Sequence, residues 1–123
     1  MPPSDLPKQI LLDFEIDDAI PDAYNIALQT AAEKGRVDLV ELLLKVDGID
    51  PNFEGGELQA APLILAAEEG HSAIVELLLA AVNIDANVRN KHFDCTPLMY
   101  ACRKGHISIV QQFEVQCENI CMD

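Results

Sequence analysis

Hydrophobic residues recur along this chain at a fixed step of thirty-five positions. Leucine triplets occupy residues 42–44 and 77–79, and similar small and apolar residues flank both. Three sets of residues keep the same step throughout: Ala32, Ala67 and Cys102; Gly35, Gly70 and Gly105; Val40, Val75 and Val110. One unit of this size cannot bury its own apolar face, so the period predicts units that stack on one another.

The pattern within each unit predicts two helices separated by a glycine. The first helices are predicted by three matching segments: Ile26-Ala-Leu-Gln-Thr-Ala-Ala-Glu-Lys-Gly-Arg, Ala61-Pro-Leu-Ile-Leu-Ala-Ala-Glu-Glu-Gly-His and Thr96-Pro-Leu-Met-Tyr-Ala-Cys-Arg-Lys-Gly-His. The second helices are predicted at residues 37–44, at residues 73–79 and from residue 107 onward. The glycine suits the left-handed conformation that ends the first helix. The paired small residues before it allow neighbouring helices to approach closely.

These units resemble the ankyrin repeat, whose pattern is T-P-L-H-x-A-A-x-x-G-H, an amphipathic helix and then G-A-D-x-N. The resemblance covers residues 26–113. It implies an all-α solenoid of stacked antiparallel helix pairs with hairpin-like loops. We expect repeats at 26–60, 61–95 and 96–123, after an N-terminal half repeat or cap at 1–25. The family repeat is about thirty-three residues long, so each loop here should hold two more.

The chain departs from the family pattern at the motif histidine, which is replaced by Gln29, Ile64 and Met99. This replacement predicts the loss of a structural hydrogen bond in every repeat. The first repeat also lacks Thr-Pro and has Ile26-Ala27 instead. In the loops, the paired residues of the G-A-D-x-N element should hold the turn through backbone hydrogen bonds. These residues are Asp50, Asn52, Asp85 and Asn87.

Atypical segments flank the repeats, as the ends of a solenoid require. At the N-terminal end, an apolar run at 10–12 and the acidic stretch 13–22 are interpreted as an outer helix with its loop. At the other end, apolar residues fall on one helical face, which predicts that the last outer helix continues as a C-terminal cap. These residues are Val110, Phe113, Cys117, Ile120 and Cys121.

Composition and charge narrow the possible partners. The 123 residues suit one domain, and the net charge is −13, of which residues 1–60 carry −9. This acidity argues against nucleic acid and anionic membranes as partners. It favours solubility in general or a partner with a basic patch, and both interpretations stay open. Residues 1–5 show no signal-peptide pattern. The four cysteines therefore indicate reduced thiols in a cytoplasmic or nuclear protein. We expect this protein to be monomeric.

Four residues of the types that bind zinc lie close together in the sequence, namely His92, Cys95, Cys102 and His106. The repeat frame argues against zinc, because His71 recurs at the position of His106 without the cysteines. We therefore interpret this histidine as part of the fold, and Cys102 as a small residue that faces the neighbouring helix. Cys117 and Cys121 lie one helical turn apart and are interpreted as core residues, with a redox or metal role as the alternative.

No other motif indicates catalysis or a cofactor. The acidic residues 13–18 resemble a calcium loop only faintly, because Asp18 and Tyr24 stand where glycine and glutamate are required. No phosphate-binding loop, nucleophile elbow, zinc-protease or dinucleotide motif is present. We therefore expect a protein that is not an enzyme and needs no metal or cofactor.

The ankyrin resemblance implies a protein-binding concave face built from the inner-helix ends and the tips of the hairpin-like loops. The inner-helix ends carry Glu33, Lys34, Glu68, Glu69, Arg103 and Lys104. The tips carry Asp22, Tyr24 and Asn25, then Glu57, Leu58 and Gln59, then His92, Phe93 and Asp94. The three large apolar residues of these tips, Tyr24, Leu58 and Phe93, are expected to be exposed anchors; alternatively, Leu58 and Phe93 fold onto the adjacent hairpin. The alternative function is a structural spacer, or a fragment of a longer array without its own partner.

Overall fold

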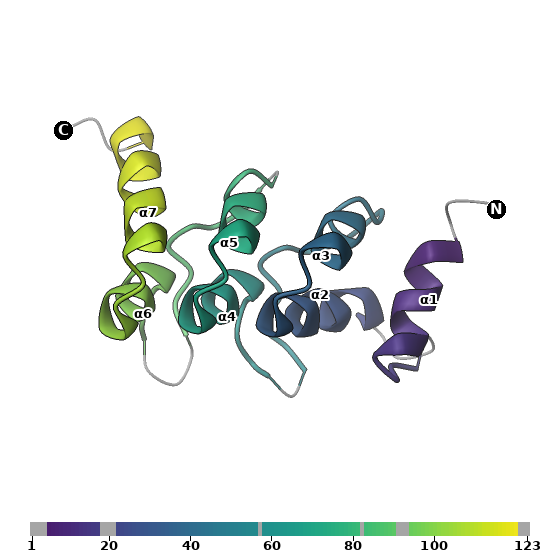
Figure 1. Ribbon diagram of the computed structural model, residues 1–123. Coiled ribbons are helices and arrows are strands. Elements are labelled where there is room, and N and C mark those ends of the chain that lie inside the picture. Colours follow the sequence, from purple (N-terminus) through teal and green to yellow (C-terminus); the bar gives the residue numbers. More distant parts are fainter. Residues whose placement is uncertain (1–4, 18–21, 57, 82, 91–93, 121–123) are drawn as a thin grey trace.

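The computed structural model describes residues 5–17, 22–56, 58–81, 83–90 and 94–120. Within these ranges the regular structure is entirely α-helical, with helix pairs joined by loops (Figure 1). The seven helices are α1 (Asp5–Asp13), α2 (Ala23–Lys34), α3 (Val37–Leu43), α4 (Pro62–Glu69), α5 (Ser72–Leu79), α6 (Pro97–Lys104) and α7 (Ile107–Ile120). The predicted all-α solenoid of stacked helix pairs is confirmed.

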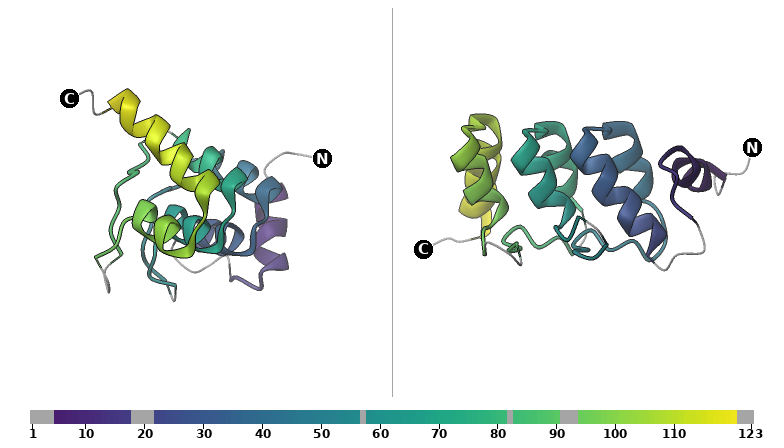
Figure 2. Two further views of the ribbon diagram at one scale, coloured as in Figure 1. Left: turned by 60° about the vertical axis from the view of Figure 1, so that its left-hand side comes forward. Right: turned by 90° about the horizontal axis from the view of Figure 1, so that it is seen from below.

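The helices form two rows. The inner helices α2, α4 and α6 pack side by side, and the outer helices α3, α5 and α7 lie in a second row against them (Figure 1). The long loops before α4 and α6 project from one edge of the stack, which gives the molecule an L-shaped profile (Figure 2). Helix α1 packs against α2 and α3 at the N-terminal end.

Short sequence signals set the limits of the inner helices. Thr96 caps α6, because its hydroxyl accepts a hydrogen bond from the backbone N–H of Met99 at 3.3 Å. Proline occupies the first turn of both α4 and α6, where its missing N–H leaves no hydrogen bond unmade. Helix α2 lacks this signal and begins at Ala23, one turn before the predicted start at Ile26. The prediction of that boundary was therefore wrong.

Two clusters of buried side chains hold the stack together. The larger one lies between the inner and outer rows and runs from α1 to α7. Its most deeply buried members include Leu43, Leu63, Ile74 and Leu78, and burying each such side chain contributes about 1.5–3 kcal/mol. The smaller cluster lies where the loops meet α4 and α6. It fixes the hairpin-like loops against the inner helices and so shapes the concave face.

A recurring imidazole contact links successive repeats. Nε2 of His71 donates to the backbone carbonyl of Glu33 at 3.0 Å, and Nε2 of His106 donates to that of Glu68 at 3.1 Å. Each ring lies over the glycine that ends the preceding inner helix. The prediction that His106 serves the fold is confirmed, and the reason is this contact between repeats.

The predicted role of the loop Asp and Asn residues is also confirmed. Asp50 Oδ1 accepts from the N–H of Asn52 at 2.9 Å, and Asp85 Oδ1 accepts from that of Asn87 at 3.0 Å. The Asn52 side chain also bridges to the next loop. Its Oδ1 accepts from the Asp85 N–H at 2.8 Å, and its Nδ2 donates to the Asn83 carbonyl at 2.8 Å. These bonds tie one loop to the next along the stack.

Gln29 does not lose the hydrogen bonds of the motif histidine, and that prediction was wrong for the first repeat. Its side-chain Nε2 donates to the carbonyls of Phe53, Gly55 and Ala60 at 3.3, 3.0 and 2.9 Å. The amide therefore reaches into the loop before α4 and holds it against α2. An amide of this length replaces an imidazole because both present an N–H donor to the same loop.

The two ends of the stack differ. At the N-terminal end, Ile10 and Leu11 of α1 are buried in the larger cluster. At the other end, α7 continues beyond the last repeat motif as predicted, and Phe113 is buried. The side chains of Cys117, Ile120 and Cys121 lie outside the described part of the chain. Cys102 was expected to face a neighbouring helix, but it is exposed, because no described helix follows α6 in the inner row.

Candidate protein-binding surface

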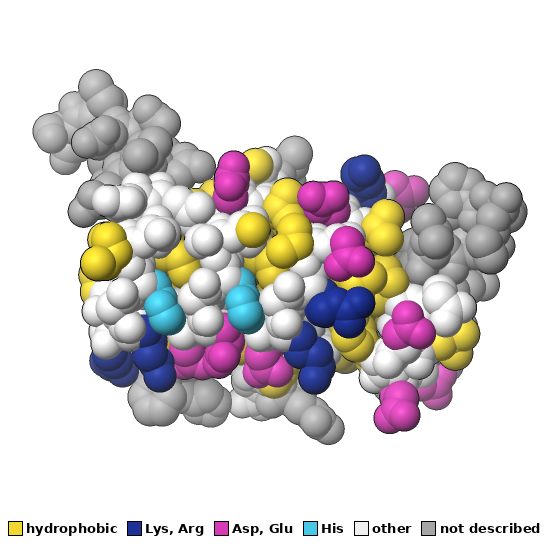
Figure 3. All heavy atoms as spheres, in the orientation of Figure 1, with side chains coloured by type: hydrophobic (Ala, Val, Ile, Leu, Met, Phe, Trp, Pro, Cys, Tyr) yellow, Lys and Arg dark blue, Asp and Glu magenta, His cyan; other side chains and the backbone are white. Residues whose placement is uncertain are grey.

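The charged residues that end the inner helices form a row along the lower edge of the stack. Each inner helix contributes one pair, and the pair charge is zero on α2, −2 on α4 and +2 on α6. Figure 3 shows basic side chains below α6 and acidic ones below α4. Lys34, Glu69, Arg103 and Lys104 are exposed, whereas Glu33 and Glu68 are half-buried. This row presents two adjacent patches of opposite charge to solvent.

Two of the predicted tip residues do not lie at a tip. Tyr24 and Asn25 belong to the first turn of α2, because that helix begins early. Tyr24 is half-buried against the larger cluster. Asn25 is 8 % exposed, and its Oδ1 accepts from the Asp50 N–H at 2.8 Å. The expectation that Asn25 is an exposed contact residue is wrong, because its side chain holds the first loop just as Asn52 holds the second.

The remaining predicted tip residues differ from one another in burial and in contacts. Leu58 is half-buried and packs against the smaller cluster, which includes Val88 and Cys95 of the next loop, so the alternative interpretation fits it better than an exposed anchor. Asp94 is exposed and forms an ion pair with Arg89 at 3.0 Å. Glu57, His92 and Phe93 lie outside the described residues.

A recess of about 470 Å³ opens where the N-terminal segment, α2 and the first hairpin-like loop converge. Its lining residues are Glu15, Ile16, Ile26, Gln29, Thr30, Glu33, Gly56 and Leu58. The volume falls within the range of about 300–1,000 Å³ that is typical of ligand pockets. We call it the α2 recess. It brings together two of the predicted contact residues, Glu33 and Leu58.

Sequence reasoning missed the other six residues that line the α2 recess, among them Ile16, Ile26 and Thr30. Ile16 lies in a segment without repeat signature, and its backbone N–H is bonded to the Leu11 carbonyl at 2.8 Å. Ile26 and Thr30 stand one helical turn apart on α2. The replacement of Thr-Pro by Ile26-Ala27 was the available signal, because it places an apolar side chain where the other repeats begin their helix.

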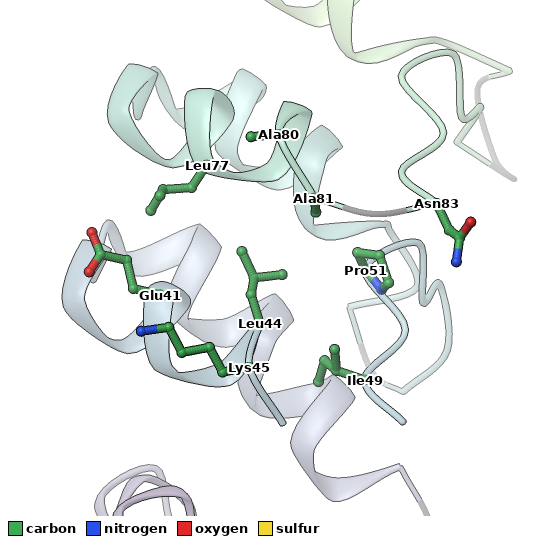
Figure 4. A pocket seen from close by; sticks show the side chains of 9 residues that line it. All are labelled: Glu41, Leu44, Lys45, Ile49, Pro51, Leu77, Ala80, Ala81 and Asn83. Carbon is green, nitrogen blue, oxygen red and sulfur yellow. The ribbon is translucent and has the colours of Figure 1, made fainter. Parts of the chain in front are cut away.

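A second recess, of about 560 Å³, lies on the opposite, outer-helix side (Figure 4). Leu44, directly after α3, and Leu77 of α5 point into it, and the loop residues after each outer helix close it. Glu41 and Lys45 lie at its edge, so the charges of its lining residues sum to zero. This outer recess is a gap between two stacked repeats and lacks the charge pattern of the inner-helix row.

The sequence profile of ankyrin repeats, in three copies, matches residues 28–118. The chain belongs to the ankyrin-repeat family. The match extends from the second turn of α2 into α7 and so includes every inner and outer helix of the two rows. No curated protein sequence matches the chain. Ankyrin repeats are generally protein–protein interaction modules, and this places the chain in that functional class.

Within this ankyrin stack, Cys95 and His106, two of the four residues considered as possible zinc ligands, contribute to packing and to contacts between repeats. Among the described residues, no three His, Cys, Asp or Glu side chains lie close enough together to share a metal ion. Cys95 is buried in the smaller cluster, where its sulfur is 3.9 Å from a guanidinium nitrogen of Arg103. His106 makes the imidazole contact described above. None of the helices in the described ranges is long and apolar enough to cross a bilayer.

Tyr100 lies just behind the charged row of the ankyrin stack. It is 6 % exposed and belongs to the smaller cluster. Burial raises the pKa of its phenol above the usual 10.0, and the neighbouring Glu68 carboxylate raises this pKa further. The phenol is therefore neutral at physiological pH, and Tyr100 acts as a packing residue beneath the charged pairs.

Proposed function

We propose that this ankyrin stack binds a partner protein through its concave face. The residues that recur between repeats are used by the fold itself, as the imidazole contacts and the Asp–Asn bonds demonstrate. The charged pairs at the inner-helix ends differ between repeats, and in the described part of the chain they form no ion pairs. Side chains that vary between repeats and form no ion pairs are available to recognise another surface.

The charge pattern on this face specifies a complementary partner. Glu68 and Glu69 would face a basic spot, and Arg103 and Lys104, one repeat further, would face an acidic one. Exposed pairs of this kind contribute little affinity each, about 0.2–1 kcal/mol, but they set orientation and speed association. The partner therefore needs two oppositely charged patches at the spacing of adjacent repeats, with most affinity coming from contacts to the loops and recesses.

An affinity capture from cell lysate tests this proposal with two variants of equal net charge. The concave variant exchanges one charge on each neighbouring inner helix, Glu69→Lys with Lys104→Glu. The control variant makes the same exchange on an outer helix, Glu41→Lys with Lys45→Glu. All four residues are exposed, so circular dichroism should show both variants folded. A partner that the native chain and the control variant retain, but the concave variant loses, supports the proposal. If only the control variant loses the partner, the partner binds at the outer recess and not at the concave face.

A second candidate function is that of a spacer, which one observation favours. The C-terminal end of the stack is open: Ile107 is 70 % exposed, and no described atom lies within 4 Å of the position that a Cβ on Gly105 would occupy. At the other two glycines this position meets the histidine of the following repeat. The open end could therefore accept another repeat. A chain that captures nothing through its concave face would favour the spacer.

We also propose that the module acts as a monomer in the cytoplasm or nucleus. Neither of the cysteines with described side chains, Cys95 and Cys102, forms a disulfide, as expected in a reducing compartment. Sedimentation of the purified chain under reducing conditions tests the monomeric state directly.

A further inference from the structure

The α2 recess holds an unusual polar group at its base. Gln29 has a side chain with no exposed surface, and its two amide N–H groups share three carbonyl acceptors. These acceptors fix the orientation of the amide, so Oε1 points away from them. This oxygen is buried and accepts no hydrogen bond from any described residue. A buried acceptor without a donor costs free energy, and it marks a position where a ligand donor would be stabilised.

Glycine next to this oxygen leaves an approach from the recess. Oε1 of Gln29 lies 3.4 Å from the position that a Cβ on Gly56 would occupy. Gly56 itself has a positive φ of 69° and is exposed. A donor that enters the recess beside Gly56 meets no side chain of that residue on its way to the oxygen.

The other polar groups of the α2 recess are also acceptors. Glu15 and Glu33 are the two charged residues of its lining, and both are negative. Neither carboxylate forms an ion pair with a described cation. Thr30 donates its hydroxyl to the Ile26 carbonyl at 3.0 Å, which leaves the Thr30 oxygen able only to accept from a ligand. Every polar side chain among the described lining residues therefore favours a donor, and two favour a positive charge.

The rest of the lining is apolar. Ile16, Ile26 and Leu58 come from three different segments and form walls on which an aliphatic chain can pack. Lysine and arginine combine such a chain with a cationic head that remains near the solvent. A neutral apolar ligand would leave both carboxylates unpaired, and an anionic ligand would be repelled by them.

We propose that the α2 recess binds a lysine or arginine side chain within an extended, partly apolar segment of the partner protein. The aliphatic stem packs on the three apolar walls, the cationic head lies between Glu15 and Glu33, and a donor of the segment reaches Gln29 Oε1. This inference rests on the proposed binding function and places one basic residue of the partner at the first repeat. It adds a contact separate from the charged pairs on α4 and α6.

A random peptide library displayed on phage provides the probe. The native chain is the bait, and selected peptides are synthesised and their Kd values measured by fluorescence anisotropy. The recess variant is Glu15→Gln with Glu33→Gln. The matched control is Glu41→Gln with Glu76→Gln, which removes the same charge from the exposed faces of the outer helices α3 and α5. We expect enriched peptides with lysine or arginine next to leucine, isoleucine or valine. Their affinity should fall about threefold to tenfold in the recess variant, weaken with added salt and remain unchanged in the control.

Several results would overturn the recess proposal without affecting the proposed function. These are failure to enrich any peptide, enrichment of peptides without a cation, or equal binding to the recess variant and the control. If selected peptides instead lose binding in the Glu69→Lys, Lys104→Glu variant, the concave face binds but the recess is not the site. If the lysate partner persists in both the concave variant and the recess variant, the proposed function itself fails.

Discussion

Replacement of Gly70 by alanine tests the imidazole contact that joins successive repeats. Gly70 ends α4 with a φ of 82°, and an added methyl group would stand 2.8 Å from Cε1 of His106. This distance is shorter than a normal contact, so the ring has to move. Its hydrogen bond to the Glu68 carbonyl is then strained or broken. Gly70→Ala should therefore weaken the interface between the second and third repeats.

Gly105 provides a matched control, because it has a similar φ of 76° but no described atom lies within 4 Å of the added methyl group. Left-handed backbone alone costs an alanine about 1 kcal/mol, so Gly105→Ala should lower the free energy of unfolding by that amount. Gly70→Ala adds the loss of a hydrogen bond and the displaced packing, about 1–2 kcal/mol more. We expect about 2–3 kcal/mol in total for Gly70→Ala.

Urea unfolding followed by circular dichroism measures both values, and a double-mutant cycle isolates the ring. In a His106→Ala background the methyl group meets no imidazole, so Gly70→Ala should then cost only as much as Gly105→Ala. The coupling free energy should be at least about 1 kcal/mol. Equal costs for Gly70→Ala and Gly105→Ala, or a coupling near zero, would refute the argument that the ring and the glycine fit each other.

Three further predictions concern the polar and titrating groups of the fold. Gln29→Ala should lower the free energy of unfolding by about 2–3 kcal/mol in urea titrations, because three loop carbonyls lose their donor; a loss below about 0.5 kcal/mol would contradict this. Thr96→Ala should cost about 1 kcal/mol by the same measurement, because the Met99 N–H loses its cap, whereas Thr96→Ser should cost much less. In a Tyr24→Phe background, the ultraviolet absorbance of tyrosinate should show Tyr100 ionising with a midpoint above pH 10.0. Since the folded pKa is raised, stability should fall as pH increases beyond 10.0, and Tyr100→Phe should lessen that fall.

The fold was predictable from the sequence because similar residue types recur at the same helix positions in three successive repeats. Gly70 and Gly105 could be assigned to helix ends from their spacing alone, and the recurrence of His71 and His106 indicated a structural role. The repeat frame does not state what the imidazole contacts, since the Glu33 carbonyl lies thirty-eight residues earlier in the chain. Only the stacking of one repeat on the next brings these groups together.

Prediction failed in the first repeat, where the sequence leaves the common pattern. Helix α2 starts early, and this early start converts Asn25 from a tip residue into a buried loop anchor. The family pattern predicts that Gln29 loses the hydrogen bonds of the motif histidine, although the amide recovers the bonds to the loop. Both errors have one cause. The family pattern describes the common backbone, whereas the backbone around a divergent residue depends on tertiary contacts.

The candidate surface was predictable in part. The charged pairs follow directly from the repeat frame, because their positions between the alanine pair and the glycine are fixed on the inner helix. The α2 recess was not predictable, because Ile16, Ile26 and Leu58 come from segments that no sequence period relates. Their meeting depends on how the N-terminal segment packs against the first repeat.

Chemical-shift mapping of the isotope-labelled chain with its captured partner tests concave-face binding most directly. We expect the largest amide shifts at the C-terminal ends of α2, α4 and α6 and in the loops that precede α4 and α6. The outer helices α3 and α5 should change little. Shifts concentrated on α3, α5 and the outer recess of Figure 4, with the inner-helix ends unchanged, would contradict the account.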